Sequence, residues 1–89
     1  MSFLHWDGWV GPSDVVIVVL DHAANVQLLD EINFSAYRSG RSFRYQGGHY
    51  RTSPVVFRPP HRGHWHVAID LGGLSGYIRA GIKVLSDAA

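Results

Sequence analysis

The sequence predicts an all-β fold: a small, antiparallel, jelly-roll-like β-sandwich of about seven strands in a single domain, residues 1–89. Short segments are β-branched or alternate between apolar and polar residues, and turn residues interrupt them about every 8–12 residues. The 10 glycines and 4 prolines supply those turns. With 46% hydrophobic and 17% charged residues, 89 residues can build one compact core but not a second domain.

The predicted strands follow one another closely along the chain. They are expected at residues 3–6, 15–20, 26–30, 42–45, 55–58, 64–71 and 77–85. The segment 15–20 is apolar at every position, so we expect both of its faces to be covered and the strand 26–30 to pair back on it. Residues 31–40 are predicted to form an excursion with at most one short helical turn near residues 32–39.

Glycine and proline mark the expected strand ends. Asp7-Gly8 is predicted to end the first strand, and Gly47-Gly48 is interpreted as a turn. Pro54 cannot donate a hydrogen bond to a neighbouring strand, so it indicates an edge position or the start of a strand.

The last two strands are predicted to form a hairpin across residues 72–76. Because side chains alternate between the faces of a strand, one set should face the core: Trp65, Val67, Ile69 and Leu71 with Ile78, Ala80, Ile82 and Val84. The other set should face outward: His64, His66, Ala68 and Asp70. The registers that keep both apolar sets on one face place Gly81 or Lys83 opposite His66.

The net charge of +1 conceals a separation of charge along the chain. The acidic residues 1–31 contain no Lys or Arg and hold Asp7, Asp14, Asp21, Asp30 and Glu31. The basic residues 32–69 contain no acid and hold Arg38, Arg41, Arg44, Arg51, Arg58 and Arg62. Either strands from the two regions lie side by side and neutralise each other, or the fold presents a basic face to an anion.

Several motifs together resemble a known family. They are Asn25-Val26-Gln27-Leu28-Leu29-Asp30, Asn33-Phe34-Ser35-x-Tyr37-x-x-Gly40, Tyr45-x-Gly47-Gly48, Ser53-Pro54-Val55 and Gly63-His64-Trp65-His66-Val67-x-Ile69-Asp70. Over nearly the whole chain they resemble the bacterial DUF1883 family of uncharacterised small domains. The resemblance implies an all-β sandwich whose relatives occur alone or ahead of a TIR domain, and it implies no activity. A smaller part of the chain is similar to GOLD domains, which are partner-binding β-sandwiches.

Histidines are the first candidate functional residues. His61, His64 and His66 form an H-x2-H-x-H pattern, and histidines two apart on a strand point the same way, as in cupin-type metal sites. Asp70 would complete the set, but it lies about 13 Å from His66 along an extended strand. Lys83, if beside the pair, also disfavours a dication. We therefore assign no metal ligand; the alternative is a pair of solvent-facing histidines.

Arginines interleaved with aromatic residues are the second candidate. Between residues 37 and 51, Arg38, Arg41 and Arg44 alternate with aromatic residues such as Tyr45. Arginine grips phosphates bidentately and aromatic rings stack on bases, which suits a nucleotide or a single-stranded nucleic acid. The aromatic rings are equally consistent with core positions and the arginines with solvated ones. Among the tryptophans, Trp9 is the expected exception to burial.

We predict no catalytic residue and no cofactor. The chain has no cysteine and no G-x-S-x-G motif, and the glycines at 47 and 48 lack the lysine of a phosphate-binding loop. The longest apolar run, residues 15–20, is far shorter than the about 20 residues of a membrane span. No membrane partner and a cytoplasmic location are therefore expected.

The favoured hypothesis is a non-enzymatic binding or sensing module for an anionic or nucleotide-like ligand. Its candidate ligand-binding residues are Arg38, Arg41, Arg44, Tyr45, His64 and His66. One alternative is an oligomerisation or protein-docking module, in which the acidic third of one copy meets the basic middle of another. A second alternative is a metal site on the histidine strand, and a nucleic-acid partner is not favoured.

Overall fold

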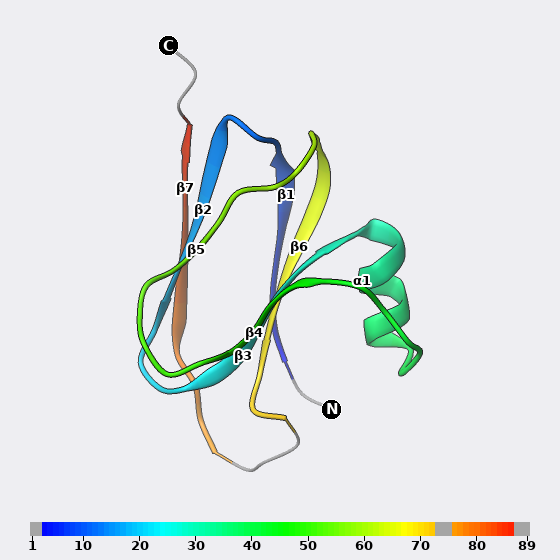
Figure 1. Cartoon of the computed structure of the whole chain (residues 1–89). Coiled ribbons are helices and arrows are strands. Elements are labelled where there is room, and N and C mark those ends of the chain that lie inside the picture. The colour runs from blue at the N-terminus through cyan, green and yellow to red at the C-terminus, as the bar shows by residue number, and fades with distance from the viewer. Residues whose placement is uncertain (1–2, 73–75, 87–89) are drawn as a thin grey trace.

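The computed structural model describes residues 3–72 and 76–86, which form two antiparallel sheets and one helix (Figure 1). The elements are β1 (Leu4–Val10), β2 (Asp14–Leu20), β3 (Ala24–Asp30), α1 (Glu31–Arg38), β4 (Gln46–Tyr50), β5 (Val55–Phe57), β6 (Gly63–Asp70) and β7 (Ala80–Ser86). The strand order is β1-β6-β3-β4 in one sheet and β5-β2-β7 in the other. The predicted all-β sandwich of seven strands is confirmed.

The main core lies between the two sheets. It takes the inward side chains of both, including Val16, Val18, Val26, Leu28, Phe57, Trp65, Val67 and Ile69, all nearly inaccessible to solvent. The predicted inward set of β6 is thus confirmed, because its odd-numbered residues 65–69 face this core. Pro54 directly precedes β5, an edge strand, as its missing N–H predicts.

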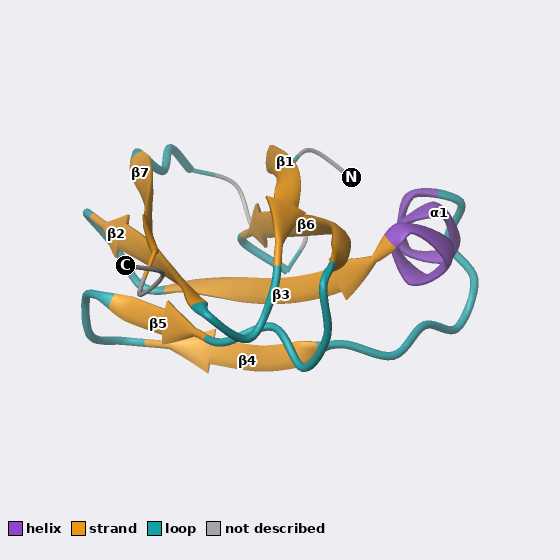
Figure 2. Ribbon diagram, turned by 90° about the horizontal axis from the view of Figure 1, so that it is seen from above, coloured by secondary structure: helices purple, strands orange, loops and turns teal. Residues whose placement is uncertain are grey.

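The helix α1 packs on the outer face of the four-stranded sheet, against β3 and β6 (Figure 2). Asp30 caps it, because its carboxylate accepts a hydrogen bond from the backbone N–H of Asn33 at 2.8 Å. Phe34 and Tyr37 from the helix pack on Leu29 and Ala68 and form a second, smaller core. Strands β3 and β6 are therefore covered on both faces. The predicted helical turn is a full helix of eight residues.

Two predicted strand pairings are wrong. β3 does not pair with β2; it lies between β6 and β4 in the other sheet. β6 and β7 do not form a hairpin either: β6 lies between β1 and β3, and β7 pairs with β2. Consequently neither Gly81 nor Lys83 lies opposite His66, whose partners are Asp7 on β1 and Leu29 on β3.

Several predicted boundaries also need correction. β1 continues through Asp7-Gly8 to Val10, because these residues pair with His66 and Trp65 of β6. Residues 42–45 lie outside the strands, and β4 begins only at residue 46.

The Gly47-Gly48 pair belongs to β4 and is not a turn. Gly47 pairs with Gln27 at a φ of 125°. A Cβ atom at Gly47 would overlap the carbonyl oxygen of Val26, so only glycine allows this close approach of the two strands.

The three-stranded sheet is covered on one face only. Val19 on β2 is 53% exposed, and Val56 and Leu85 on the same face are also exposed, so the expected cover on both faces of β2 is wrong. Val84 lies opposite the buried Val16 on the inner face, as predicted, but it is 38% exposed on the edge strand β7. In the described part of the chain, no helix is long and apolar enough to cross a membrane.

Candidate functional site

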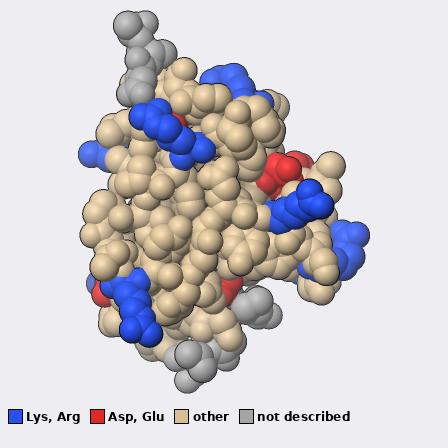
Figure 3. All heavy atoms as spheres, viewed as in Figure 1, with Lys and Arg blue, Asp and Glu red and all other residues tan. Residues whose placement is uncertain are grey.

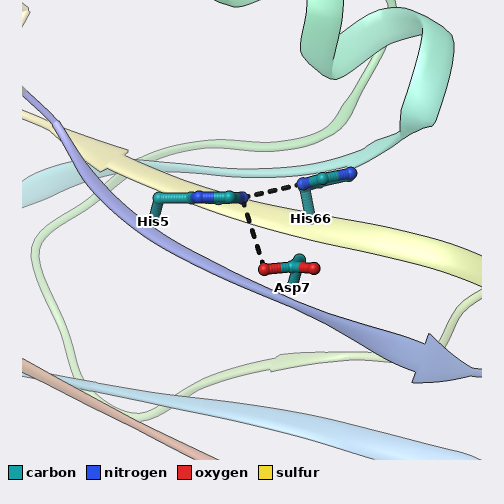
Figure 4. A group of neighbouring side chains, drawn as sticks. All are labelled: His5, Asp7 and His66. Atoms are coloured by element: carbon teal, nitrogen blue, oxygen red, sulfur yellow. Dashed lines mark hydrogen bonds and ion pairs between the residues drawn. The ribbon is translucent and has the colours of Figure 1, made fainter.

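Five titratable side chains meet where β1, β6 and the start of α1 come together. His5 and Asp7 stand two apart on β1, and His64 and His66 stand two apart on the adjacent β6. Asp7 lies opposite His66 in the register, so all four side chains point to the outer face of the sheet. Glu31, the first residue of α1, completes the group from above. Figure 4 shows His5 on β1 in contact with both His66 on β6 and Asp7 on β1.

The five side chains form a closed ring of contacts, which we call the histidine–carboxylate ring. His5 Nε2 lies 2.7 Å from His66 Nδ1, and His66 Nε2 lies 2.7 Å from Glu31 Oε2. The same Glu31 oxygen lies 2.7 Å from His64 Nδ1. His64 Nε2 lies 2.6 Å from Asp7 Oδ2, and Asp7 Oδ1 lies 3.9 Å from His5 Nε2.

The contacts shift the pKa values of four of these groups. The hydrogen bond to Asp7 raises the pKa of His64, and Glu31 adds to this effect. The hydrogen bond from His64 lowers the pKa of Asp7, and the hydrogen bond from His66 lowers that of Glu31. Burial lowers the pKa of His5, with the neighbouring His66 acting in the same direction. Because both nitrogens of His64 face carboxylates, His64 donates two hydrogen bonds only as the imidazolium ion.

Aromatic packing holds the ring of contacts in place. The Phe34 ring stacks on His66 with 4.1 Å between centroids and an angle of 3° between the rings, and on His5 at 4.3 Å. Trp9, which is 69% exposed, stacks on His64 at 5.8 Å. The side chain of His66 is only 5% exposed, whereas that of Glu31 is 62% exposed. The site therefore has a rigid floor on β6 and a carboxylate at the solvent boundary.

A hollow of about 420 Å³ opens beside the histidine–carboxylate ring. It is lined by His5, Glu31, Ile32, Phe34, Ser35, Arg38, Arg41 and His66. The guanidinium of Arg38 lies 5.6 Å above the Phe34 ring, which keeps its charge at the rim of the hollow. Among the described residues, neither Arg38 nor Arg41 forms an ion pair with a carboxylate, so two positive charges remain available there.

Comparison with known proteins identifies the family. The model of a family described as "Domain of unknown function (DUF1883)" matches residues 1–88. The chain belongs to the DUF1883 family. The resemblance seen in the sequence motifs is thereby confirmed. No curated protein and no solved structure matches the chain. Because the family description names no activity, the function of this DUF1883 domain has to be argued from its geometry.

The structure brings together four of the six predicted ligand residues. Arg38 and Arg41 line the hollow, and His66 lies at its floor with His64 beside it. His64 and His66 do not face solvent freely, as one interpretation held, because the protein's own carboxylates engage them. Arg44 and Tyr45 lie on the segment between α1 and β4, outside the residues that line the hollow.

The metal set that the sequence suggested does not assemble in the DUF1883 domain. His61 stacks near Trp65 at 5.0 Å, away from the outer face. Asp70 accepts hydrogen bonds from the Tyr37 hydroxyl and the Asn25 amide, at 2.6 and 2.9 Å. Lys83 belongs to β7 in the other sheet, so the argument against a dication that rested on it fails.

Sequence reasoning missed His5, Asp7 and Glu31 as members of the site. The signal for the first two was present: residues two apart on a strand share a face, so His5-x-Asp7 matches His64-x-His66. This pattern indicates a common site only when β1 and β6 are known to be neighbouring strands. Glu31 joins only because α1 folds back over the sheet.

The charge separation along the chain produces no single basic face on the side shown in Figure 3. The basic side chains lie at separate places around the edge of this view, with acidic side chains beside some of them. Among the described residues, an ion pair between Arg62 and Asp14 at 3.8 Å links an arginine of the basic region to the acidic region. Asp7 and Glu31 of the acidic region contact histidines. The hollow beside α1 gathers two arginines, Arg38 and Arg41, with the carboxylate of Glu31 also in its lining.

Proposed function

We propose that this domain is a non-enzymatic binding module that holds a small anion in the hollow between α1 and the four-stranded sheet. The observation that carries the proposal is the pair of arginines, Arg38 and Arg41, at one hollow, without carboxylate partners among the described residues. Guanidinium groups bind phosphate and carboxylate groups through paired hydrogen bonds. A phosphate-bearing metabolite, such as a nucleotide, is the ligand class that this pair supports.

The hollow modifies the ligand hypothesis that the sequence suggested. Arg38 and Arg41 supply the charge, while Arg44 and Tyr45 have no part in the lining. The rings of Phe34, His5 and His66 stack on one another, so their faces are largely used within the protein. The ligand is therefore recognised by its charged groups more than by stacking of a base.

The experiment is a thermal-shift and calorimetric screen with inorganic phosphate, nucleoside mono- and diphosphates, and dicarboxylates. A ligand at 100 times its dissociation constant stabilises the domain by about 2.7 kcal/mol. The variant Arg38→Gln/Arg41→Gln should lose that stabilisation. The matched control Arg44→Gln/Arg51→Gln removes the same charge from outside the hollow and should bind as the parent protein does. Equal losses in both variants, or no binding of any anion in the panel, would refute the proposal.

The competing hypothesis of charge-driven self-association receives less support. It requires the acidic first third to be available for another copy. Asp7 and Glu31 are instead engaged by histidines, and Asp14 accepts a hydrogen bond from the Gly11 backbone at 2.8 Å. Size-exclusion chromatography at low and high salt tests for self-association. A dimer that forms at low salt and dissociates at high salt would support this competing hypothesis.

The proposed setting is the bacterial cytoplasm. The bacterial part rests on the family resemblance, which implies relatives that occur alone or ahead of a TIR domain, and the cytoplasmic part rests on the expectation drawn from the sequence. In such a protein, an anion bound at α1 would serve as the signal that the domain senses. Fractionation of cells that produce the tagged protein tests the location, and recovery outside the cytoplasm would contradict it.

A further inference from the structure

We infer that Glu31, His64 and His66 form a binding site for a divalent transition-metal ion, with zinc the best fit. The inference does not depend on the anion proposal, because it uses different side chains of the same region. It starts from three ligand atoms that converge: His64 Nδ1 and His66 Nε2 each lie 2.7 Å from Glu31 Oε2. All three atoms lie within 4.8 Å of one another.

The spacing of these atoms suits a metal ion after a small adjustment. Zinc binds imidazole nitrogens and carboxylate oxygens at about 2.0–2.2 Å, which places neighbouring ligands of a tetrahedron about 3.3 Å apart. The Glu31 oxygen would therefore move outward by roughly half an ångström. Its side chain is mostly exposed at the first position of α1, so this movement disturbs no packing.

Each histidine has an outer contact, and that of His64 is of the kind that ligating histidines normally have. A histidine that binds a metal through one nitrogen usually donates the N–H of the other to a carboxylate, a backbone carbonyl or water. His64 offers Nδ1 to the site while its Nε2 lies 2.6 Å from Asp7 Oδ2. His66 offers Nε2 while its Nδ1 lies 2.7 Å from His5 Nε2. Both imidazoles are thus oriented by a second partner.

The site also combines a rigid base with an open side. His64 and His66 are two apart on β6, the strand that lies between β1 and β3, and Phe34 packs flat on His66. Three protein ligands leave a fourth tetrahedral position, and Glu31 and His66 both line the hollow beside α1. Two imidazoles and one carboxylate favour zinc, cobalt or nickel over the harder magnesium and calcium ions.

A second set of atoms competes for the same ion. His5, Asp7 and His66 also lie within 4.8 Å of one another, but Asp7 and His5 are 3.9 Å apart. In that set His66 would bind through Nδ1, and Glu31 would be its outer partner. We favour Glu31, His64 and His66 because each ligand–ligand contact to Glu31 is short and both histidines have an outer partner. The two sets predict opposite orders for the loss of zinc affinity in the variants His5→Gln and Glu31→Gln.

The experiment is a titration of the tag-free, chelator-treated protein with ZnCl₂ by calorimetry, with CoCl₂ absorption as the second readout. We expect one zinc ion per chain with an affinity in the micromolar range or tighter, and a tetrahedral cobalt spectrum. His5→Gln removes an outer partner and should weaken binding about 10–100-fold. Glu31→Gln and His64→Gln remove ligands and should each weaken it more. Circular dichroism and melting temperature establish that the variants fold.

The matched control is Asp21→Asn/His22→Gln. It removes another exposed His–carboxylate pair, in which His22 Nδ1 lies 3.1 Å from Asp21 Oδ1 and which belongs to neither candidate set. Zinc binding should be unchanged there. Arg38→Gln/Arg41→Gln, which tests the anion proposal, removes two positive charges from the lining of the same hollow and should not weaken zinc binding. The inference fails if the parent protein binds zinc no better than the Glu31→Gln variant, or if His5→Gln is the most damaging change.

Discussion

The hydroxyl of Tyr37 on α1 donates a hydrogen bond of 2.6 Å to Asp70 Oδ2 at the end of β6. Asp70 is 3% exposed, and its other oxygen accepts from the Asn25 amide and the Gly72 backbone N–H. A buried carboxylate is tolerated when its lone pairs are satisfied. The Tyr37–Asp70 contact thus fastens the helix to the sheet and lets an acid remain in the second core.

Tyr37→Phe should destabilise the domain by about 1–3 kcal/mol, because it leaves one oxygen of a buried carboxylate without its donor. Urea unfolding at neutral pH measures the loss. An unchanged free energy of unfolding would show that the contact contributes nothing.

The same variant should change the pH dependence of stability. Burial and the hydrogen bond to Asp70 raise the pKa of Tyr37 above its usual value of about 10. A raised pKa in the folded state gives stability that is complete below pH 10 and is lost as the pH rises, because the unfolded chain ionises first. The difference in free energy of unfolding between the parent protein and Tyr37→Phe should therefore narrow above about pH 10. A difference that stayed constant above that pH would show that ionisation of Tyr37 does not affect stability.

Phe34→Ala should cost about 3–4 kcal/mol, since Phe34 is buried and its ring packs on His5 and His66. Ile32→Ala is the matched control on the same helix, because Ile32 is 81% exposed and should change stability by less than about 0.5 kcal/mol. Chemical denaturation of both compares them directly. Equal costs would mean that α1 is not docked through Phe34.

Asp30→Ala should cost about 1 kcal/mol by removing the N-cap of α1, where the carboxylate accepts from the Asn33 backbone at 2.8 Å. Asp30→Ser retains an acceptor and should recover most of the loss. Thermal unfolding of the parent protein, Asp30→Ala and Asp30→Ser measures their order of stability. If Asp30→Ser were no more stable than Asp30→Ala, loss of the N-cap would not explain the destabilisation.

Gly47→Ala should destabilise the domain by at least about 1–3 kcal/mol, because the added methyl group overlaps the Val26 carbonyl in the neighbouring strand. Gly81→Ala in β7 is the control, since no atom lies within 4 Å of the position of its Cβ. Melting temperatures should fall for the first variant and stay close to the parent value for the second. Two similar values would overturn the assigned role of Gly47.

The sequence by itself determined the fold class and the inner face of the histidine strand. Alternation of apolar residues at 65, 67 and 69 is a local pattern, and a strand with that pattern can bury only one set of side chains. The missing N–H of Pro54 likewise predicted an edge position or the start of a strand, and both descriptions fit β5. These features depend on neighbours in the chain, so they could be predicted without a structure.

Only the tertiary structure decided which strands are neighbours, and with that the candidate site. β1 and β6 pair across about sixty residues. Turn residues such as those at 72–76 predict a change of chain direction, but they do not predict which sheet the next strand joins. The ring of His5, Asp7, Glu31, His64 and His66 requires both that pairing and the return of α1. Because sequence periodicity carries no information on distant pairing, histidines predicted to face solvent were found bound to two carboxylates.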